Sequence, residues 1–346
     1  MVDTHDEQKI LAAKIRIVRR IFVVMVTIAV WGVCGFVAWR ITANREAHQE
    51  IFAASQPYDL TKVPVPIFPD LGKATSVGER GVTMYAVDLQ RVSSKPGLSQ
   101  SAIPGAQMQM RAYLPAGKHA DRSLPCVLIA PAGTPLIWGK DLDDDNYHDE
   151  ALPYAEAGIV AIIFSLDGSV FEKTSVAEIE KGFRQFRDAD AGLVNARNAL
   201  EFALAKIPTV DPQKIFTAGY SSAGALSLLF AAHEPRLRGC ISFAGSTDHV
   251  KRLSSAITPE VRDHLPGIES FIRRSSPLTH ASRIHCPTFL FQAEDDDNTH
   301  LADTKAFGNE VQRINPSLKL ETVPQGGHSQ EMLREGRRRA IEWMKQ

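Results

Sequence analysis

Residues 214–224 read KIFTAGYSSAG. An apolar, strand-like run leads into a glycine, a tyrosine and two serines, and an alanine and a glycine follow. The stretch is close to the G-x-S-x-G pattern, in which a serine stands on a sharp turn between a strand and a helix. Small residues are needed two positions to either side of that serine, and Gly219 and Ala223 fill those positions around Ser221. The following helix would place its positive dipole end behind the hydroxyl. Ser221 is therefore the candidate nucleophile, ahead of Ser222 and of a plain strand–turn–helix junction.

Strand-like and helix-like segments alternate on both sides of this turn. Strands are predicted over 81–91, 107–114, 126–130, 159–164, 214–219, 237–243, 287–292 and 318–323. Helices are predicted over 151–157, 188–207, 222–233, 301–313 and 330–344. The first two strands have the pattern of a hairpin, and the segment 246–283 is less regular. Such alternation predicts an α/β fold with a mostly parallel sheet, whose functional residues follow the carboxyl ends of the strands.

Two later strand ends carry the residues that would activate a serine. PTFLFQ leads into AEDDDN, where a carboxylate could hold an imidazole in the correct tautomer. Asp296 is our choice for this acid, with Asp297 and Asp295 as alternatives to it. LETVP leads into QGGHS, in which two glycines let the loop pass close to the serine. His328 is the candidate base, because it completes the chain order Ser, Asp, His.

A nucleophilic serine also needs donors for the negative charge that forms on the substrate oxygen. One donor would be the backbone N–H of Ser222, and the other should come from the loop after an earlier strand. The apolar run CVLIA is followed by PAGTP, in which Gly133 brings its backbone close to a substrate. The alternative for this loop is an ordinary Gly/Pro turn.

The amino-terminal segment predicts a membrane anchor. Residues 21–39 carry no charge, and at ~1.5 Å per residue a helix of this length spans about 29 Å, close to a bilayer core. Basic residues are more frequent before the run than after it, which places residues 1–20 in the cytoplasm. The alternative is a cleaved signal peptide. We therefore expect a cytoplasmic tail (1–20), a transmembrane anchor (21–39), a proline-rich linker (40–80) and an extracytoplasmic catalytic domain (81–346).

Composition excludes some functions. The formal net charge of −1 and the lack of a basic stripe argue against a nucleic-acid partner. No C-x-x-C pair is present, so the common zinc spacings are absent, and we expect neither a metal nor an organic cofactor. The four cysteines are interpreted as small core residues, with one disulfide among the last three as the alternative; they are Cys34, Cys126, Cys240 and Cys286.

An acidic loop over residues 141–149 has three interpretations. It fits a solvated helix start, since acidic residues complement the helix dipole. It lacks the glycine that an EF-hand calcium loop requires, so a metal site is the weaker interpretation. The third is that Asp143 and Asp144 lie at the rim of the active site and select a cationic group on the substrate.

From about Gln107 to Gln346 the sequence resembles the catalytic domain of the prolyl oligopeptidase and dienelactone hydrolase branches of the α/β-hydrolases. The motifs that carry the resemblance are MRAYLPAG, CVLIAPAGTP, VDPQKIFTAGYSSAGALSLL, CPTFLFQAEDDDNTH and PQGGHSQEM. The resemblance implies an α/β-hydrolase fold with Ser221, Asp296 and His328 as the triad. Many relatives have His-Gly where this chain has Pro-Ala before Gly133. The dienelactone hydrolases proper use cysteine as nucleophile, and residues 1–80 are too short for the β-propeller of true prolyl oligopeptidases.

These observations predict a membrane-anchored serine hydrolase that cleaves a small ester, or a short peptide, through an acyl-enzyme. Without a propeller, a carboxylesterase is favoured over a peptidase. Two alternatives remain: a catalytically inactive binding protein on the same fold, and an acyltransferase in which an alcohol other than water takes the acyl group.

Overall fold

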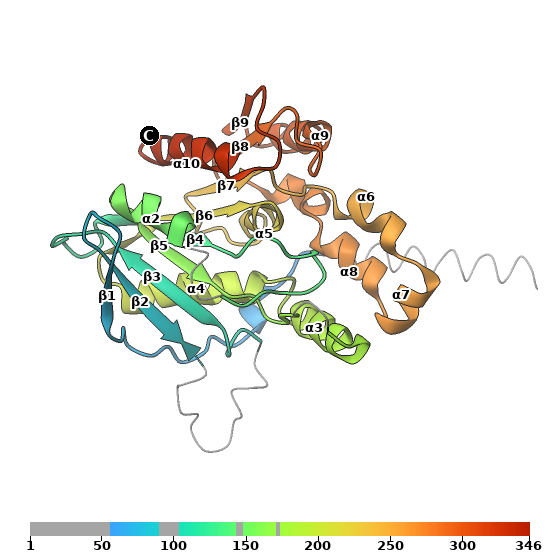
Figure 1. Cartoon of the computed structure of the whole chain (residues 1–346), viewed down its shortest axis with the longest axis horizontal. Helices are drawn as coiled ribbons and strands as arrows, with labels where there is room; N and C mark the ends of the chain where they lie inside the picture. Colours follow the sequence, from blue (N-terminus) through green and yellow to red (C-terminus); the bar gives the residue numbers. More distant parts are fainter. Residues whose placement is uncertain (1–55, 90–103, 143–147, 171–173) are drawn as a thin grey trace, which may run out of the picture. The chain divides into compact units, whose positions relative to one another are not determined.

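The computed structural model describes residues 56–89, 104–142, 148–170 and 174–346, and Ser55–Gln346 form one compact unit (Figure 1). The predicted tail and anchor, 1–39, lie outside the described residues. None of the described helices has the length and apolar character that a bilayer crossing requires. The described cysteines, Cys126, Cys240 and Cys286, are free thiols, so the alternative of a disulfide among them is not realised.

A nine-stranded sheet organises the unit, in the order β1-β2-β3-β5-β4-β6-β7-β8-β9. The strands from β5 and β4 to β9 run parallel, whereas β1, β2 and β3 are antiparallel neighbours and β3 pairs antiparallel with β5. The strands are β1 (Ala74–Val77), β2 (Val82–Asp88), β3 (Gln109–Leu114), β4 (Leu124–Ile129), β5 (Val160–Phe164), β6 (Val210–Tyr220), β7 (Gly239–Phe243), β8 (Thr288–Ala293) and β9 (Leu318–Val323).

Helices cover both faces of this sheet (Figure 1). The α-helices are α2 (His148–Glu156), α3 (Val176–Asp188), α4 (Leu193–Lys206), α5 (Ser222–Ala231), α6 (His249–Leu253), α7 (Pro259–His264), α8 (Ile268–Ser275), α9 (Leu301–Gln312) and α10 (Gln330–Met344). The short 3₁₀ helices are η1 (Leu60–Lys62), η4 (Ser254–Ala256) and η5 (Pro277–Arg283).

The sheet separates two hydrophobic cores because successive side chains of a strand point to opposite faces. In β4, Cys126 and Leu128 enter the core that α4 and α5 cover. Val127 and Ile129 enter the other core, which α2 and α10 cover. The apolar runs 126–130 and 159–164, which were predicted as strands, therefore belong to β4 and β5, two central strands covered on both faces, as expected of an α/β fold.

The segment between β7 and β8 holds α6, α7 and α8, beside α3 (Figure 1). Phe271 of α8 contacts both Phe183 and Phe186 of α3, with ring centroids 5.3 Å and 6.0 Å apart. α3 was not among the helices predicted from the sequence, although Ser175 and Glu178 form a capping box at its start. These helices together form a cap beside the ends of the strands.

Part of the predicted linker belongs to the folded unit instead. β1 lies within 40–80 and pairs with β2 at the edge of the sheet. Tyr58 and Leu60 are buried in the core. The buried guanidinium of Arg197 in α4 donates to the carbonyl oxygens of Leu60, Val63 and Pro64. The described part of the proline-rich segment is therefore attached to the folded unit by its apolar side chains and by its backbone carbonyl groups.

Two histidines lie beside the helices that follow β6 and β7: His249 is buried, and His233 is partly buried. His233, just after α5, contacts the carbonyl oxygen of Leu229 through Nδ1 at 2.7 Å. Burial, with a smaller contribution from the neighbouring His280, lowers the pKa of its imidazole to about 4, although the hydrogen bond with Leu229 acts to raise this pKa. Burial, together with the charge of Arg252, lowers the pKa of His249 to about 3. Both side chains are therefore neutral in the folded protein at pH 7.

We expect these histidines to make the protein less stable in mild acid. In the unfolded chain they take up protons near pH 6.5, whereas the folded chain resists protonation until a much lower pH. The unfolded state then binds more protons, and stability decreases as pH falls from about 6.5, with His233 alone accounting for about 3 kcal/mol by pH 4. Urea unfolding at pH 7 and pH 4 measures the change. His233→Asn keeps a donor for Leu229 and cannot titrate, so equal losses in variant and wild type would contradict the prediction.

Candidate active site

Ser221 occupies the sharp turn between β6 and α5. Its backbone has φ 55° and ψ −119°, a conformation that is costly for a residue with a side chain, by about 1–3 kcal/mol. Its N–H donates to the carbonyl oxygen of Phe243 in β7. The turn leaves no room at Gly219, where a Cβ atom would lie 2.2 Å from the carbonyl oxygen of Ala223. The structure thus confirms the tight strand–turn–helix geometry for which the small residues around Ser221 were predicted.

The loop after β4 lies beside this turn. The hydroxyl of Ser222 accepts a hydrogen bond of 3.0 Å from the N–H of Thr134. Gly133, the residue before Thr134, has a φ of 84°, which favours glycine. Ser222 is the first residue of α5, so its own N–H has no acceptor within the helix. The two predicted oxyanion donors, Ser222 and Gly133, are therefore brought to neighbouring positions.

The same contact separates the two serines by role. The Ser222 hydroxyl is buried and is engaged with the β4 loop. Ser221 is half-exposed and stands on the strained turn. This difference supports Ser221, rather than Ser222, as the reactive hydroxyl.

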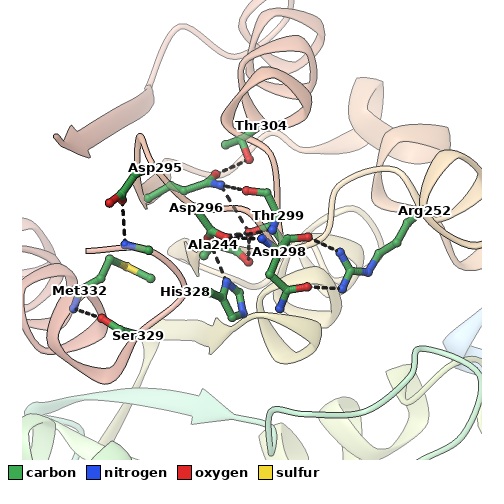
Figure 2. A network of polar contacts seen from close by, with 12 residues as sticks. Ala244, Arg252, Asp295, Asp296, Asn298, Thr299, Thr304, His328, Ser329 and Met332 are labelled. Carbon is green, nitrogen blue, oxygen red and sulfur yellow. Dashed lines mark hydrogen bonds and ion pairs between the residues drawn. The ribbon is translucent and has the colours of Figure 1, made fainter. Parts of the chain in front are cut away.

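His328 and Asp296 meet at the ends of β9 and β8, as Figure 2 shows. His328 Nδ1 lies 2.9 Å from Asp296 Oδ2. The Asp296 side chain is fully buried, and that of His328 is mostly so. Of the three adjacent aspartates that the sequence left open, Asp296 is the one that contacts the imidazole.

Asp296 is surrounded by donors besides His328. Its Oδ1 accepts from the N–H groups of Asn298 and Thr299, each at 2.9 Å, and the Thr299 hydroxyl lies 2.8 Å from Oδ2. Burial raises the pKa of this carboxyl, but the hydrogen bonds from His328 and Thr299 outweigh burial and hold the pKa below its usual value. Asp296 is therefore a carboxylate at neutral pH.

Asp295 has a separate function, because it holds the loop that carries the histidine. Its carboxylate accepts from the N–H of Gly327 at 2.7 Å and of Gly326 at 3.3 Å. Both glycines have positive φ values, 53° and 144°. Asp296 thus binds the imidazole of His328, and the adjacent Asp295 binds the loop that carries it. Both contacts come from the loop after β8.

His328 is further held by Tyr220, the residue before Ser221. The two rings stack with centroids 4.7 Å apart and planes inclined by 29°. Burial, with the nearby charges of Asp296 and Glu150, raises the pKa of Tyr220 to about 12, so the phenol is neutral. His328 Nε2 is buried and has no hydrogen-bond partner among the described residues. Its bond to Ser221 is not formed here, and catalytic hydrogen bonds of free enzymes often tighten only when substrate is bound.

A small cavity of about 20 Å³ lies on the side of Ser222 and Thr134. Phe186 and Leu226 contribute to its mostly apolar wall. A volume of this size accommodates about one water-sized group. The wall of this cavity includes Ser222 but not Ser221, so the cavity lies beside the candidate nucleophile.

Asp143, Asp144 and Asp145 of the acidic loop lie outside the described residues. In the described part of the chain, no group of three or more His, Cys, Asp or Glu side chains is placed to hold a metal ion.

Residues 178–346, which include Ser221, Asp296 and His328, match the prolyl oligopeptidase family. The protein is an α/β-hydrolase with a prolyl-oligopeptidase-like domain. It is a serine hydrolase of the esterase or peptidase type. No curated protein sequence matches the chain.

Solved structures agree on the fold of this α/β-hydrolase. An acetyl xylan esterase from Paenibacillus sp. R4 is 17% identical with a TM-score of 0.56, over 85% of this chain and 92% of that one. A cold-adapted esterase from an Arctic intertidal metagenomic library is 16% identical with a TM-score of 0.52, over 80% of this chain and 97% of that one. Dipeptidyl peptidase 4 of Porphyromonas gingivalis is 16% identical with a TM-score of 0.53, over 69% of this chain but only 33% of that one.

Proposed function

We propose that this hydrolase cleaves esters of short acyl groups through an acyl-enzyme, with Ser221 as nucleophile, His328 as general base and Asp296 as the orienting acid. The observation that carries the proposal is the buried Asp296–His328 pair, which leaves Nε2 of the imidazole without a partner. A carboxylate on Nδ1 stabilises the tautomer in which Nε2 accepts a proton.

In the first step, His328 Nε2 takes the proton of Ser221 as the hydroxyl oxygen attacks the substrate carbonyl. The negative charge on the carbonyl oxygen is held by the N–H groups of Ser222 and Gly133, each worth about 3 kcal/mol in such sites. The imidazolium, stabilised by Asp296, then gives its proton to the leaving alcohol. Water repeats the sequence on the acyl-enzyme and releases the acid.

The geometry favours a small acyl group. The leaving group must lie near His328, which protonates it, so the acyl group lies away from the imidazole. We place it toward Ser222 and Thr134, where the cavity has room for little more than a methyl group. Acetyl and propionyl esters fit this side better than long-chain esters.

We further propose that residues 21–39 hold the protein in a membrane as a single-pass anchor, with the catalytic domain on the extracytoplasmic side. The uncharged run and the excess of basic residues before it support this proposal. Recovery of the full chain in the membrane fraction after carbonate extraction is expected. Recovery in the soluble fraction would overturn it.

Labelling of the full-length protein with a fluorophosphonate, followed by an ester and amide panel, tests the function. We expect the adduct on Ser221, and turnover that is highest for acetyl and propionyl esters and falls with longer acyl chains. Faster cleavage of aminoacyl amides than of esters would instead establish a peptidase. Transfer of the acyl group to added alcohols in preference to water would establish an acyltransferase. Folded protein that is not labelled would contradict the proposal and favour a binding function.

A further inference from the structure

The acid loop after β8 is attached to the cap at one point that the catalytic groups do not include. Arg252, in α6, donates from Nη1 to the main-chain oxygen of Asn298 at 2.6 Å and from Nη2 to its side-chain Oδ1 at 2.8 Å (Figure 2). Two donors of one rigid guanidinium therefore hold one residue by its backbone and its side chain. Such a contact restrains both the position and the orientation of Asn298.

Asn298 is also a hydrogen-bond donor to the buried carboxylate of Asp296. Its N–H donates to Asp296 Oδ1 at 2.9 Å, and Asp296 Oδ2 in turn lies 2.9 Å from His328 Nδ1. A continuous series of hydrogen bonds thus runs from Arg252 through Asn298 and Asp296 to the imidazole (Figure 2). Arg252 therefore reaches His328 only through Asn298 and Asp296 in this series.

The acid loop needs this support because one of its sides faces open space. A polar cleft of about 270 Å³ lies between the loop after β7, α6 and the start of α9, and both Arg252 and Asn298 line it. Asn298 is exposed, so apolar packing does not fix it. α6 itself is placed by its first residue, His249, which is buried and whose N–H donates to the Ser276 hydroxyl.

We propose that Arg252 is a positioning residue for the Asp296–His328 pair, acting through Asn298. It keeps the Asn298 N–H on Asp296, and this in turn keeps the carboxylate oriented for His328 Nδ1. The proposal rests on the proposed function, since it describes how the same triad is held. It also makes the cap a part of the catalytic apparatus, because α6 lies in the segment between β7 and β8.

Steady-state kinetics of full-length Arg252→Ala with a short-chain ester test this role. We expect kcat to fall about tenfold with KM nearly unchanged. The variant loses the hydrogen bonds from the charged guanidinium to Asn298, and Asn298 contacts Asp296 but not the substrate. Arg252→Lys keeps the charge without the paired donors, so it should restore kcat only in part. Lys251→Ala is the matched control, because it removes the adjacent cation of the same helix, and it should leave kcat within about twofold.

Two further measurements distinguish an effect of Arg252 on the Asp296–His328 pair from a general effect of α6 on the fold. The downfield proton signal of His328 Nδ1–H should shift or broaden in Arg252→Ala and stay unchanged in Lys251→Ala. The losses in Arg252→Ala and Asn298→Ala should be less than additive in the double variant, because both act through one contact.

Several outcomes would overturn the proposal without touching the triad. An unchanged kcat and proton signal in Arg252→Ala would show that the contact is incidental. A raised KM with unchanged kcat would show that Arg252 binds substrate in the cleft instead. Equal losses in Lys251→Ala would show a general effect of α6 on the fold. Failure of the proposed function itself is recognised separately, as wild-type protein that no fluorophosphonate labels.

Discussion

Ser221→Ala is expected to lower kcat for a short-chain ester by about 10⁵–10⁶-fold and to abolish fluorophosphonate labelling. The reason is that covalent catalysis requires the oxygen that this variant removes, while the donors at Ser222 and Gly133 can still bind the substrate carbonyl. The methyl group of alanine fits the turn, so the fold should survive. Hydrolysis rates and the mass of the labelled peptide provide the measurement.

Ser222→Ala is the matched control for this first prediction. It keeps the backbone N–H that is assigned to the oxyanion and removes only the hydroxyl that accepts from Thr134. We expect labelling to persist, with activity reduced about tenfold at most, as for the loss of one hydrogen bond. Labelling that survives in Ser221→Ala and disappears in Ser222→Ala would reverse the assignment of the nucleophile.

Asp296→Asn is expected to lower kcat by about 10⁴-fold. The amide cannot stabilise the imidazolium, and its NH₂ group favours the tautomer with the proton on His328 Nε2, where it cannot accept the serine proton. The kcat of Asp296→Asn should stay low throughout the range from pH 5 to 9.

The ionised carboxylate of Asp296 also stabilises the fold. Its pKa is lower in the folded protein than in the unfolded chain, so this stabilisation is present above about pH 4 and is lost as pH falls through the folded pKa.

The neighbouring aspartate provides the control for this second prediction. Asp297 is exposed, whereas Asp296 is buried against His328. Asp297→Asn should leave kcat within about threefold, as is usual for a surface substitution away from such features. Comparable losses in the two variants would contradict the choice of Asp296 as the orienting acid.

Much of the site was predictable because its residues follow strand ends. Ser221, Asp296 and His328 each come after a short apolar run, and in a parallel sheet the carboxyl ends of such runs meet at one edge. The parallel order of β4 to β9 and the hairpin of β2 and β3 were likewise legible from alternating segments. The capping box formed by Ser175 and Glu178 is a local sequence signal for α3, which was not predicted.

Other features had little or no local signal. β1 is a short and mostly exposed edge strand, so its four residues show neither an apolar run nor a clear alternation. Tyr58 is buried by contacts with His233 and His280, which lie far along the chain. The stacking of Tyr220 on His328 joins the last residue of β6 to the loop after β9. Such contacts depend on which loops the sheet order brings together.

The sequence by itself determined the α/β fold and predicted Ser221 as the candidate nucleophile in the chain order Ser, Asp, His, because glycine placement and apolar periodicity act over a few neighbouring residues. Only the tertiary structure decided which of three adjacent aspartates holds the imidazole. It also showed that Asp295 holds the histidine loop and that Arg252 of the cap restrains Asn298. The physical reason is that adjacent residues of a turn can be of the same type while their side chains point in different directions. The direction of each side chain is set by contacts with segments that are distant in the chain.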